Sequence, residues 1–175
     1  MRKVAILSAF LIFHLSASGQ ILKPVTWEFS SKQVNDSEYD LLFTAHIDEG
    51  WTVYSQYLES DDGPVATSFT YDEKPYFSLV GKNVETSGHR KELNDPLFDN
   101  MRVIKFSEKV TFTQRIKVSD TSKPITGYLE FMTCDDSRCL PPSDVDFSFD
   151  LKPADATAVK KTDHTPATPA AQSTA

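Results

Sequence analysis

The stretch DVDFSFDL, residues 144–151, decides the fold class. Apolar side chains occupy every second position, and aspartate or serine occupies the positions between them. Because successive side chains of a β-strand point to opposite faces, a period of two predicts a strand with one buried face and one solvent-exposed face. The segment therefore indicates a half-buried antiparallel strand rather than a helix.

The same alternation recurs along most of the chain. It is strong over Tyr39–Ile47 and Val110–Val118. Further strands are expected over Val25–Phe29, Thr52–Tyr57, Val65–Tyr71, Tyr76–Val80, Arg102–Phe106 and Ile125–Thr133. About seven to nine short strands, separated by Gly, Pro, Asn and Asp, predict an all-β fold, an immunoglobulin-like antiparallel β-sandwich. A small closed barrel is the competing architecture.

The segment Ser87–Met101 interrupts this rhythm. It is polar, long for a sandwich loop, and carries Leu97 and Phe98 near its end. Loops of this length without structure of their own tend to be functional or mobile. The segment is interpreted either as a functional loop or as an ordinary solvated loop whose Phe98 packs into the core.

Residues 1–19 have the pattern of a secretory signal peptide. Arg2 and Lys3 precede the apolar run Val4–Leu15, and small residues follow up to Gly19. This order of charge, apolar run and small-residue cleavage site is typical of exported proteins. Since the apolar run is short for a bilayer span, cleavage is favoured over an uncleaved anchor. We expect a periplasmic protein with no membrane insertion after cleavage.

The rest of the chain divides into a domain and a tail. One domain is expected over residues 20–152, because about 130 residues can bury a sizeable core. Residues 153–175 are rich in Ala, Thr and Pro, a composition that predicts a disordered tail. Loss of the signal peptide lowers the Lys and Arg count from 18 to 16 against 25 Asp and Glu, a net charge of −9. An acidic chain without a basic run is a poor candidate for binding nucleic acid.

The informative chemistry lies in FMTCDDSRCLPP, residues 131–142, which contains Cys134 and Cys139. In an exported protein the two cysteines are expected to pair if the geometry permits. A ring this small stabilises the fold by about 2 kcal/mol at most, and a domain of this size does not need a disulfide to fold. Redox exchange, a structural bridge and a soft metal ion all stay open from the residues alone.

The neighbouring side chains modestly favour a reactive pair. Arg138 adjoins Cys139 and would favour its thiolate, whereas Asp135 and Asp136 would disfavour the thiolate of Cys134. Metal binding is the weakest alternative, because two cysteines supply only two strong ligands and no second Cys pair or His-x-x-His completes a set. We therefore expect no metal and no cofactor.

At this point the sequence resembles a known family, the amino-terminal periplasmic domain of the thiol:disulfide interchange protein DsbD, also called the disulfide bond corrector domain. The cysteine segment resembles the family's active-site hairpin. GWTVYSQ, residues 50–56, is similar to its early aromatic strand, and DPLFD, residues 95–99, lies where the family carries its cap loop. The resemblance covers about residues 22–152. Here the cysteines are one residue closer together than in the best-known members.

The resemblance implies an immunoglobulin-like sandwich that passes reducing equivalents from a membrane DsbD-type donor to thioredoxin-like proteins or disulfide isomerases. It implies that Cys134 and Cys139 are the redox pair, with Cys139 forming mixed disulfides. Phe98 corresponds to the cap-loop aromatic, and Tyr54 and Trp51 to its aromatic surroundings. The family's membrane and thioredoxin-like domains have no counterpart here, so as a stand-alone chain or a fragment it would need a separate donor. A secreted binding or adhesion sandwich with a structural disulfide is the alternative.

Overall fold

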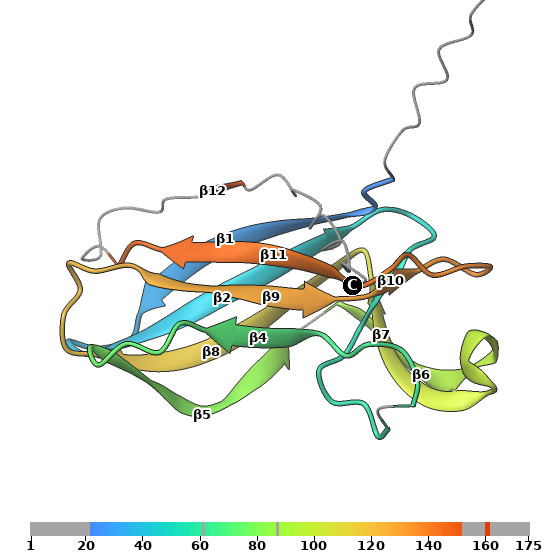
Figure 1. The fold of residues 1–175 in the computed structure, drawn as a ribbon, viewed down its shortest axis with the longest axis horizontal. Coiled ribbons are helices and arrows are strands. Elements are labelled where there is room, and N and C mark those ends of the chain that lie inside the picture. The colour runs from blue at the N-terminus through green and yellow to red at the C-terminus, as the bar shows by residue number, and fades with distance from the viewer. Residues whose placement is uncertain (1–21, 61, 87, 152–159, 162–175) are drawn as a thin grey trace, which may run out of the picture.

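The computed structural model describes residues 22–60, 62–86, 88–151 and 160–161. These residues form an antiparallel β-sandwich (Figure 1). The predicted signal peptide and most of the predicted tail lie outside the described residues. The strands are β1 (Val25–Gln33), β2 (Glu38–Ile47), β3 (Thr52–Tyr54), β4 (Ser68–Tyr71), β5 (Phe77–Thr86), β6 (His89–Asp95), β7 (Met101–Ser107), β8 (Lys109–Val118), β9 (Ile125–Phe131), β10 (Thr133–Cys134), β11 (Ser143–Phe149) and β12 (Lys160–Lys161), with a short 3-10 helix η1 (Pro96–Phe98) after β6.

Two sheets face each other and a third extends from one end. The first sheet has the order β12-β1-β2-β8-β5, and the facing sheet has the order β11-β9-β4. The third sheet, β10-β3-β7-β6, lies at the end where the cysteine hairpin and η1 project (Figure 1). The predicted immunoglobulin-like sandwich is confirmed. The third sheet carries Tyr54 and Cys134, two of the residues that the sequence singled out.

Aromatic rings fill the space between the two facing sheets. The Phe43 ring of β2 lies 5.0 Å from that of Phe147 and 5.1 Å from that of Phe149, both on β11, and 4.6 Å from Phe69 of β4. Gly127 of β9 pairs with Phe147, and a Cβ on it would lie 2.6 Å from that ring. Glycine therefore allows this close approach. We call the large cluster of buried apolar side chains around Phe43 the main core; β1, β2, β8, β9 and β11 supply most of it, and it extends to Trp51, Val53 and Phe106.

The prediction of a long loop over Ser87–Met101 is wrong for most of that segment. β6 pairs with β7 along its whole length, and η1 follows it. This strand could not be recognised from the sequence because it has no alternating apolar face. Six of its seven residues are exposed or half-buried. Backbone pairing with β7 places the segment in the sheet, in keeping with the strong dependence of strand formation on context.

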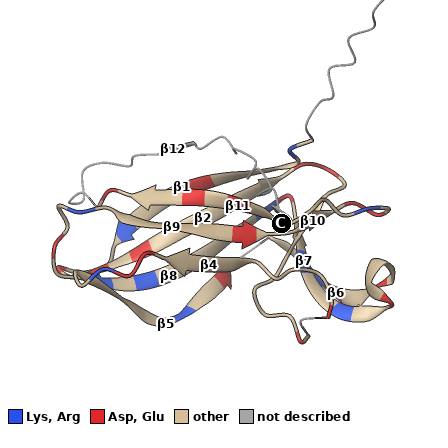
Figure 2. Cartoon of the chain, in the orientation of Figure 1, with Lys and Arg blue, Asp and Glu red and all other residues tan. Residues whose placement is uncertain are grey.

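Two residues of the predicted tail, Lys160 and Lys161, are described as β12, which pairs with Phe29 and Glu28 of β1. β1 is otherwise the edge of its sheet, and an edge strand offers unpaired backbone groups to a further strand. In the part of the chain that the structure describes, none of the helical segments has the length and apolar character of a membrane span. Figure 2 shows lysine and arginine separated along the strands rather than gathered in one run.

Candidate functional site

The two cysteines close a tight hairpin after β10. Their sulfurs are bonded at 2.05 Å, and their Cα atoms lie 4.0 Å apart. Backbone hydrogen bonds from Asp135 N to Arg138 O and from Leu140 N to Thr133 O flank the pair. The cysteines therefore face each other at a non-hydrogen-bonded position of an antiparallel pair, where opposing Cα atoms come closest. The predicted disulfide is confirmed.

The Asp135 side chain shapes the turn between the cysteines. Its Oδ1 accepts hydrogen bonds from Ser137 N at 2.8 Å, Ser137 Oγ at 2.8 Å and Arg138 N at 2.9 Å. Aspartate commonly forms such turns by accepting from backbone groups that follow it. The hydrogen bonds from Ser137, followed by those from Arg138, lower the pKa of Asp135 to about 2. The sequence Asp-Asp-Ser-Arg thus folds locally into the hairpin.

Arg138 lies between Asp135 and Trp51. Its Nε donates to Asp135 Oδ2 at 3.2 Å, and its guanidinium lies 5.8 Å from the centre of the Trp51 ring. Trp51 in turn packs in the main core. The guanidinium of Arg138 therefore contacts both an aspartate and an aromatic ring. Its influence on the Cys139 thiolate stays a prediction.

A small apolar cluster, separate from the main core, encloses the disulfide on one side. Its buried members are Tyr54, Val103 and Cys134, and half-buried side chains pack against them: Leu58, Leu97, Phe98, Met132 and Cys139. We call these eight residues the site cluster. Cys134 is fully buried, whereas Cys139 is half-buried. One sulfur-bearing residue is thus enclosed while the other borders the solvent.

Phe98 joins this cluster from η1. Its ring lies 5.8 Å from that of Tyr54, at 86° in an edge-to-face arrangement, which is a favourable geometry for aromatic pairs. The structure therefore brings Phe98, Tyr54 and both cysteines together. The alternative that Phe98 packs into the core of the sandwich is wrong, because the ring is half-buried in the site cluster.

Two charged residues whose roles the sequence analysis missed lie at this turn, Asp95 at its start and Lys105 on β7. The Asp95 carboxylate is 1% exposed and accepts from Tyr54 Oη at 3.2 Å, Lys105 Nζ at 3.1 Å and Leu97 N at 3.1 Å. Burial, and then the Asp95 charge, raise the pKa of Tyr54 well above its usual value. Aspartate before Pro96 is a helix-start signal that could have identified Asp95, whereas nothing local in the sequence distinguishes Lys105.

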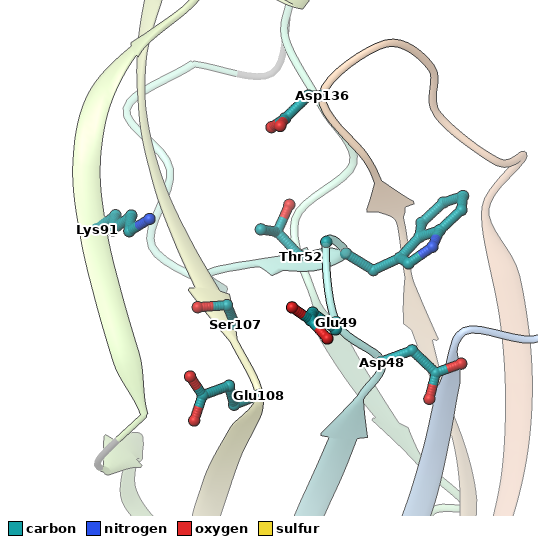
Figure 3. A pocket seen from close by; sticks show the side chains of 9 residues that line it. Asp48, Glu49, Thr52, Lys91, Ser107, Glu108 and Asp136 are labelled. Carbon is teal, nitrogen blue, oxygen red and sulfur yellow. The ribbon is translucent and has the colours of Figure 1, made fainter.

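An acidic cleft of about 520 Å³ opens beside the hairpin (Figure 3). Asp48, Glu49, Glu108 and Asp136 line it together with Lys91, and Asp136 belongs to the hairpin itself. Within residues 22–60, 62–86 and 88–151, no group of three or more His, Cys, Asp and Glu side chains is arranged to hold a metal ion. The surface on this side of the disulfide is therefore acidic.

The chain is thus an antiparallel β-sandwich domain with a disulfide in a hairpin at one end. The disulfide packs beside the turn that carries Phe98. The fold is similar to that of the N-terminal domain of DsbD from Neisseria meningitidis in its reduced form, at 16% identity over 80% of this chain and 91% of that chain, with a TM-score of 0.51. The N-terminal periplasmic domain of ScsB from Proteus mirabilis is 16% identical over 71% of this chain and 51% of that one, with a TM-score of 0.48. No family model and no curated protein matches the sequence. The predicted resemblance in fold to the DsbD domain is confirmed.

Proposed function

We propose that the chain is a thiol:disulfide oxidoreductase of the protein-disulfide reductase type that acts as a redox relay through Cys134 and Cys139. The observation that carries this proposal is the position of the disulfide. It closes a four-residue turn outside the main core, with Cys134 fully buried and Cys139 half-buried. A structural bridge is most effective when it joins distant segments. This one joins residues that hairpin hydrogen bonds already hold together, which favours a chemical role.

The proposed exchange begins with both cysteines reduced. The Cys139 thiolate attacks one sulfur of a partner disulfide, so the partner's S–S bond breaks and a mixed disulfide forms. The Cys134 thiolate then attacks Cys139 Sγ, which re-forms the intramolecular disulfide and releases the partner as a dithiol. Two electrons pass to the partner, and the two protons from Cys134 and Cys139 balance its two new thiols. The half-buried position of Cys139 supports its assignment as the attacking residue.

The proposed setting is the periplasm. A membrane DsbD-type protein would reduce the Cys134–Cys139 disulfide, and thioredoxin-like proteins or disulfide isomerases, including those of cytochrome c maturation, would accept the electrons. The signal-peptide pattern of residues 1–19 and the resemblance in fold to the DsbD domain support this setting.

Phe98 is proposed as a lid over the disulfide. A reduced relay in an oxidising compartment must avoid reacting with unrelated oxidants, and exchange requires a clear approach to the attacking sulfur. The Phe98 ring packs in the same cluster as both cysteines, so partner docking would displace it before exchange, as loops commonly do in gating.

Trapping of mixed disulfides tests the relay. A Cys134→Ala variant should accumulate a mixed disulfide with an oxidised thioredoxin-like protein, because no second thiol remains to release the partner. Non-reducing gel electrophoresis and mass spectrometry measure the adduct, and Cys139→Ala is the matched control. Trapping by Cys139→Ala alone would reverse the assignment of the two cysteines, and trapping by neither variant would refute the relay.

The alternative, a secreted binding or adhesion sandwich with a structural bridge, predicts a different response to mild dithiothreitol. A relay disulfide should open while the fold persists, whereas a structural bridge should resist reduction until the protein unfolds. Mass spectrometry of alkylated samples, beside circular dichroism of the same samples, distinguishes the two.

A further inference from the structure

Asp95 joins both ends of the turn that carries Phe98. Its Oδ1 accepts from Leu97 N at 3.1 Å, at the start of η1. Its backbone oxygen accepts from Asn100 N at 3.0 Å, just beyond the end of η1. A single residue therefore closes the loop that presents Phe98 to the site cluster.

Two strands next to the turn, β3 and β7, supply hydrogen-bond donors to the Asp95 side chain. Tyr54 of β3 and Lys105 of β7 face each other directly in the strand register. Both donate to Asp95 Oδ2, at 3.2 Å from Tyr54 Oη and 3.1 Å from Lys105 Nζ. The side chain of Lys105 is 12% exposed and that of Asp95 is 1% exposed. Removing one partner of so enclosed an ion pair leaves the other charge without compensation.

The turn also has a conformational cost that these contacts offset. Asp99 and Asn100 follow η1 with φ values of 51° and 60°. Two successive non-glycine residues in the left-handed region are unfavourable, although Asp and Asn tolerate this region best. Without the Asp95 contacts the turn would therefore be free to relax into other conformations and carry Phe98 away from the disulfide.

We propose that the Lys105–Asp95 ion pair is a latch that holds the Phe98 turn against the Cys134–Cys139 disulfide, which makes Lys105 a positioning residue for thiol exchange. The inference rests on the proposed function and deepens it, because it identifies what keeps the lid closed. Lys105 acts in this role through the turn and not directly on a sulfur. The raised pKa of Tyr54 keeps its hydroxyl protonated, so the phenol remains a second donor to the same carboxylate.

Removal of the Lys105 charge should change the rate at which the cysteines are alkylated. The direction of that change distinguishes a latch from a direct electrostatic effect on the thiols. A cation near a thiol favours the thiolate, so removing the Lys105 charge would slow the reaction of the cysteines with an alkylating agent. Release of the lid would speed the same reaction, because the population with exposed sulfurs would rise. The two roles of Lys105 therefore predict opposite outcomes.

The test measures alkylation of the reduced, folded protein by iodoacetamide, whose iodide the thiolate displaces. Lys105→Met, which keeps the length of the side chain without its charge, should react about tenfold faster, as expected for loss of one charged hydrogen bond. Lys91→Met is the matched control, because exposed Lys91 faces Lys105 in the register of β6 and β7. The control should react at the wild-type rate or more slowly.

Two further measurements test the latch, and the first of them, which does not use Lys105→Met, keeps the latch falsifiable if that variant folds poorly. Tyr54→Phe removes only one hydroxyl and should accelerate alkylation less than Lys105→Met. Lys105→Met should add nothing in a Phe98→Ala background, where the lid is already absent. Wild-type or slower rates in folded Lys105→Met, or a wild-type rate in Tyr54→Phe, would overturn the latch, as would full acceleration in the Phe98→Ala background.

The alkylation rates involve no protein partner, so they are independent of the relay itself. If Cys134→Ala traps no thioredoxin-like protein while Lys105→Met still accelerates alkylation, the latch stands and the proposed function fails. If trapping succeeds and alkylation does not accelerate, the relay stands and the latch fails.

Discussion

The main core and the site cluster differ in size and in how they are held together. The main core lies between two sheets, where the Phe43 ring alone lies within 6 Å of Phe29, Phe147, Phe149 and Phe69. The site cluster has three fully enclosed members and depends for the rest on half-buried side chains. Most of the apolar burial that stabilises the domain is therefore remote from the disulfide. Apart from Leu140 and the contact of Arg138 with Trp51, the hairpin makes few contacts with the main core, so we expect it to change with little effect on the sandwich.

The two regions also differ in charge. Rings and aliphatic side chains make up the main core, whereas a buried carboxylate and a nearly buried ammonium lie beside the site cluster. A buried ion pair is weak support for stability, because desolvation of both charges offsets much of their attraction. We interpret the Asp95–Lys105 pair as fixing the position of the turn rather than strengthening the fold.

Truncating one ring in each region should give the largest contrast. Phe43→Ala should lower the free energy of unfolding by about 3–5 kcal/mol, as for other large core side chains. Phe98→Ala should cost less than about 2 kcal/mol, because a half-exposed ring buries less apolar area. Urea unfolding of the oxidised proteins, followed by circular dichroism, measures both values. Equal losses would remove the distinction between the two regions.

Reducing the disulfide should have a smaller effect. The ring that Cys134 and Cys139 close is short, so its loss should lower the free energy of unfolding by about 2 kcal/mol or less. A typical domain has roughly 5–15 kcal/mol in total, so the reduced protein should stay folded. Urea unfolding with and without a reducing agent provides the comparison, and Cys134→Ala/Cys139→Ala controls for the reagent. Loss of the strand signal on reduction at room temperature would favour the structural role.

The sequence predicted the main core better than the surroundings of the site. Alternation over Tyr39–Ile47 and Val110–Val118 identified two strands whose buried faces make that core. β6 has no such alternation, because it is an edge strand of the third sheet with almost no buried face. The cysteine motif and the position of Phe98 were visible locally. Lys105 was not, because its role depends on the pairing of β3 with β7, which brings together residues about fifty positions apart.

The smallest effect, and the sharpest check on the local structure of the hairpin, concerns the titration of Asp135. Hydrogen bonds from Ser137 and Arg138 lower its pKa from 3.8 to about 2. Because the folded-state pKa is depressed, the stabilisation from this carboxylate is fully present above about pH 3.8 and is lost as the pH falls through about 2. Because solvent still reaches the Asp135 carboxylate and screens its contacts, the effect on overall stability should be small.

Carboxyl carbon NMR shifts of Asp135, recorded against pH, measure this pKa directly. Ser137→Ala removes the hydroxyl donor but keeps the backbone N–H, so the pKa should rise only part of the way to 3.8. Over the same pH range the ring signals of Phe43 and Phe147 should not follow the Asp135 titration, because the rings packed against them belong to Phe and Tyr side chains, which do not titrate at acidic pH. A midpoint near 3.8 in the unmodified protein would mean that the turn is open in solution. Movement of the core signals with the Asp135 titration would mean that the hairpin and the sandwich are coupled, against the separation of the two regions.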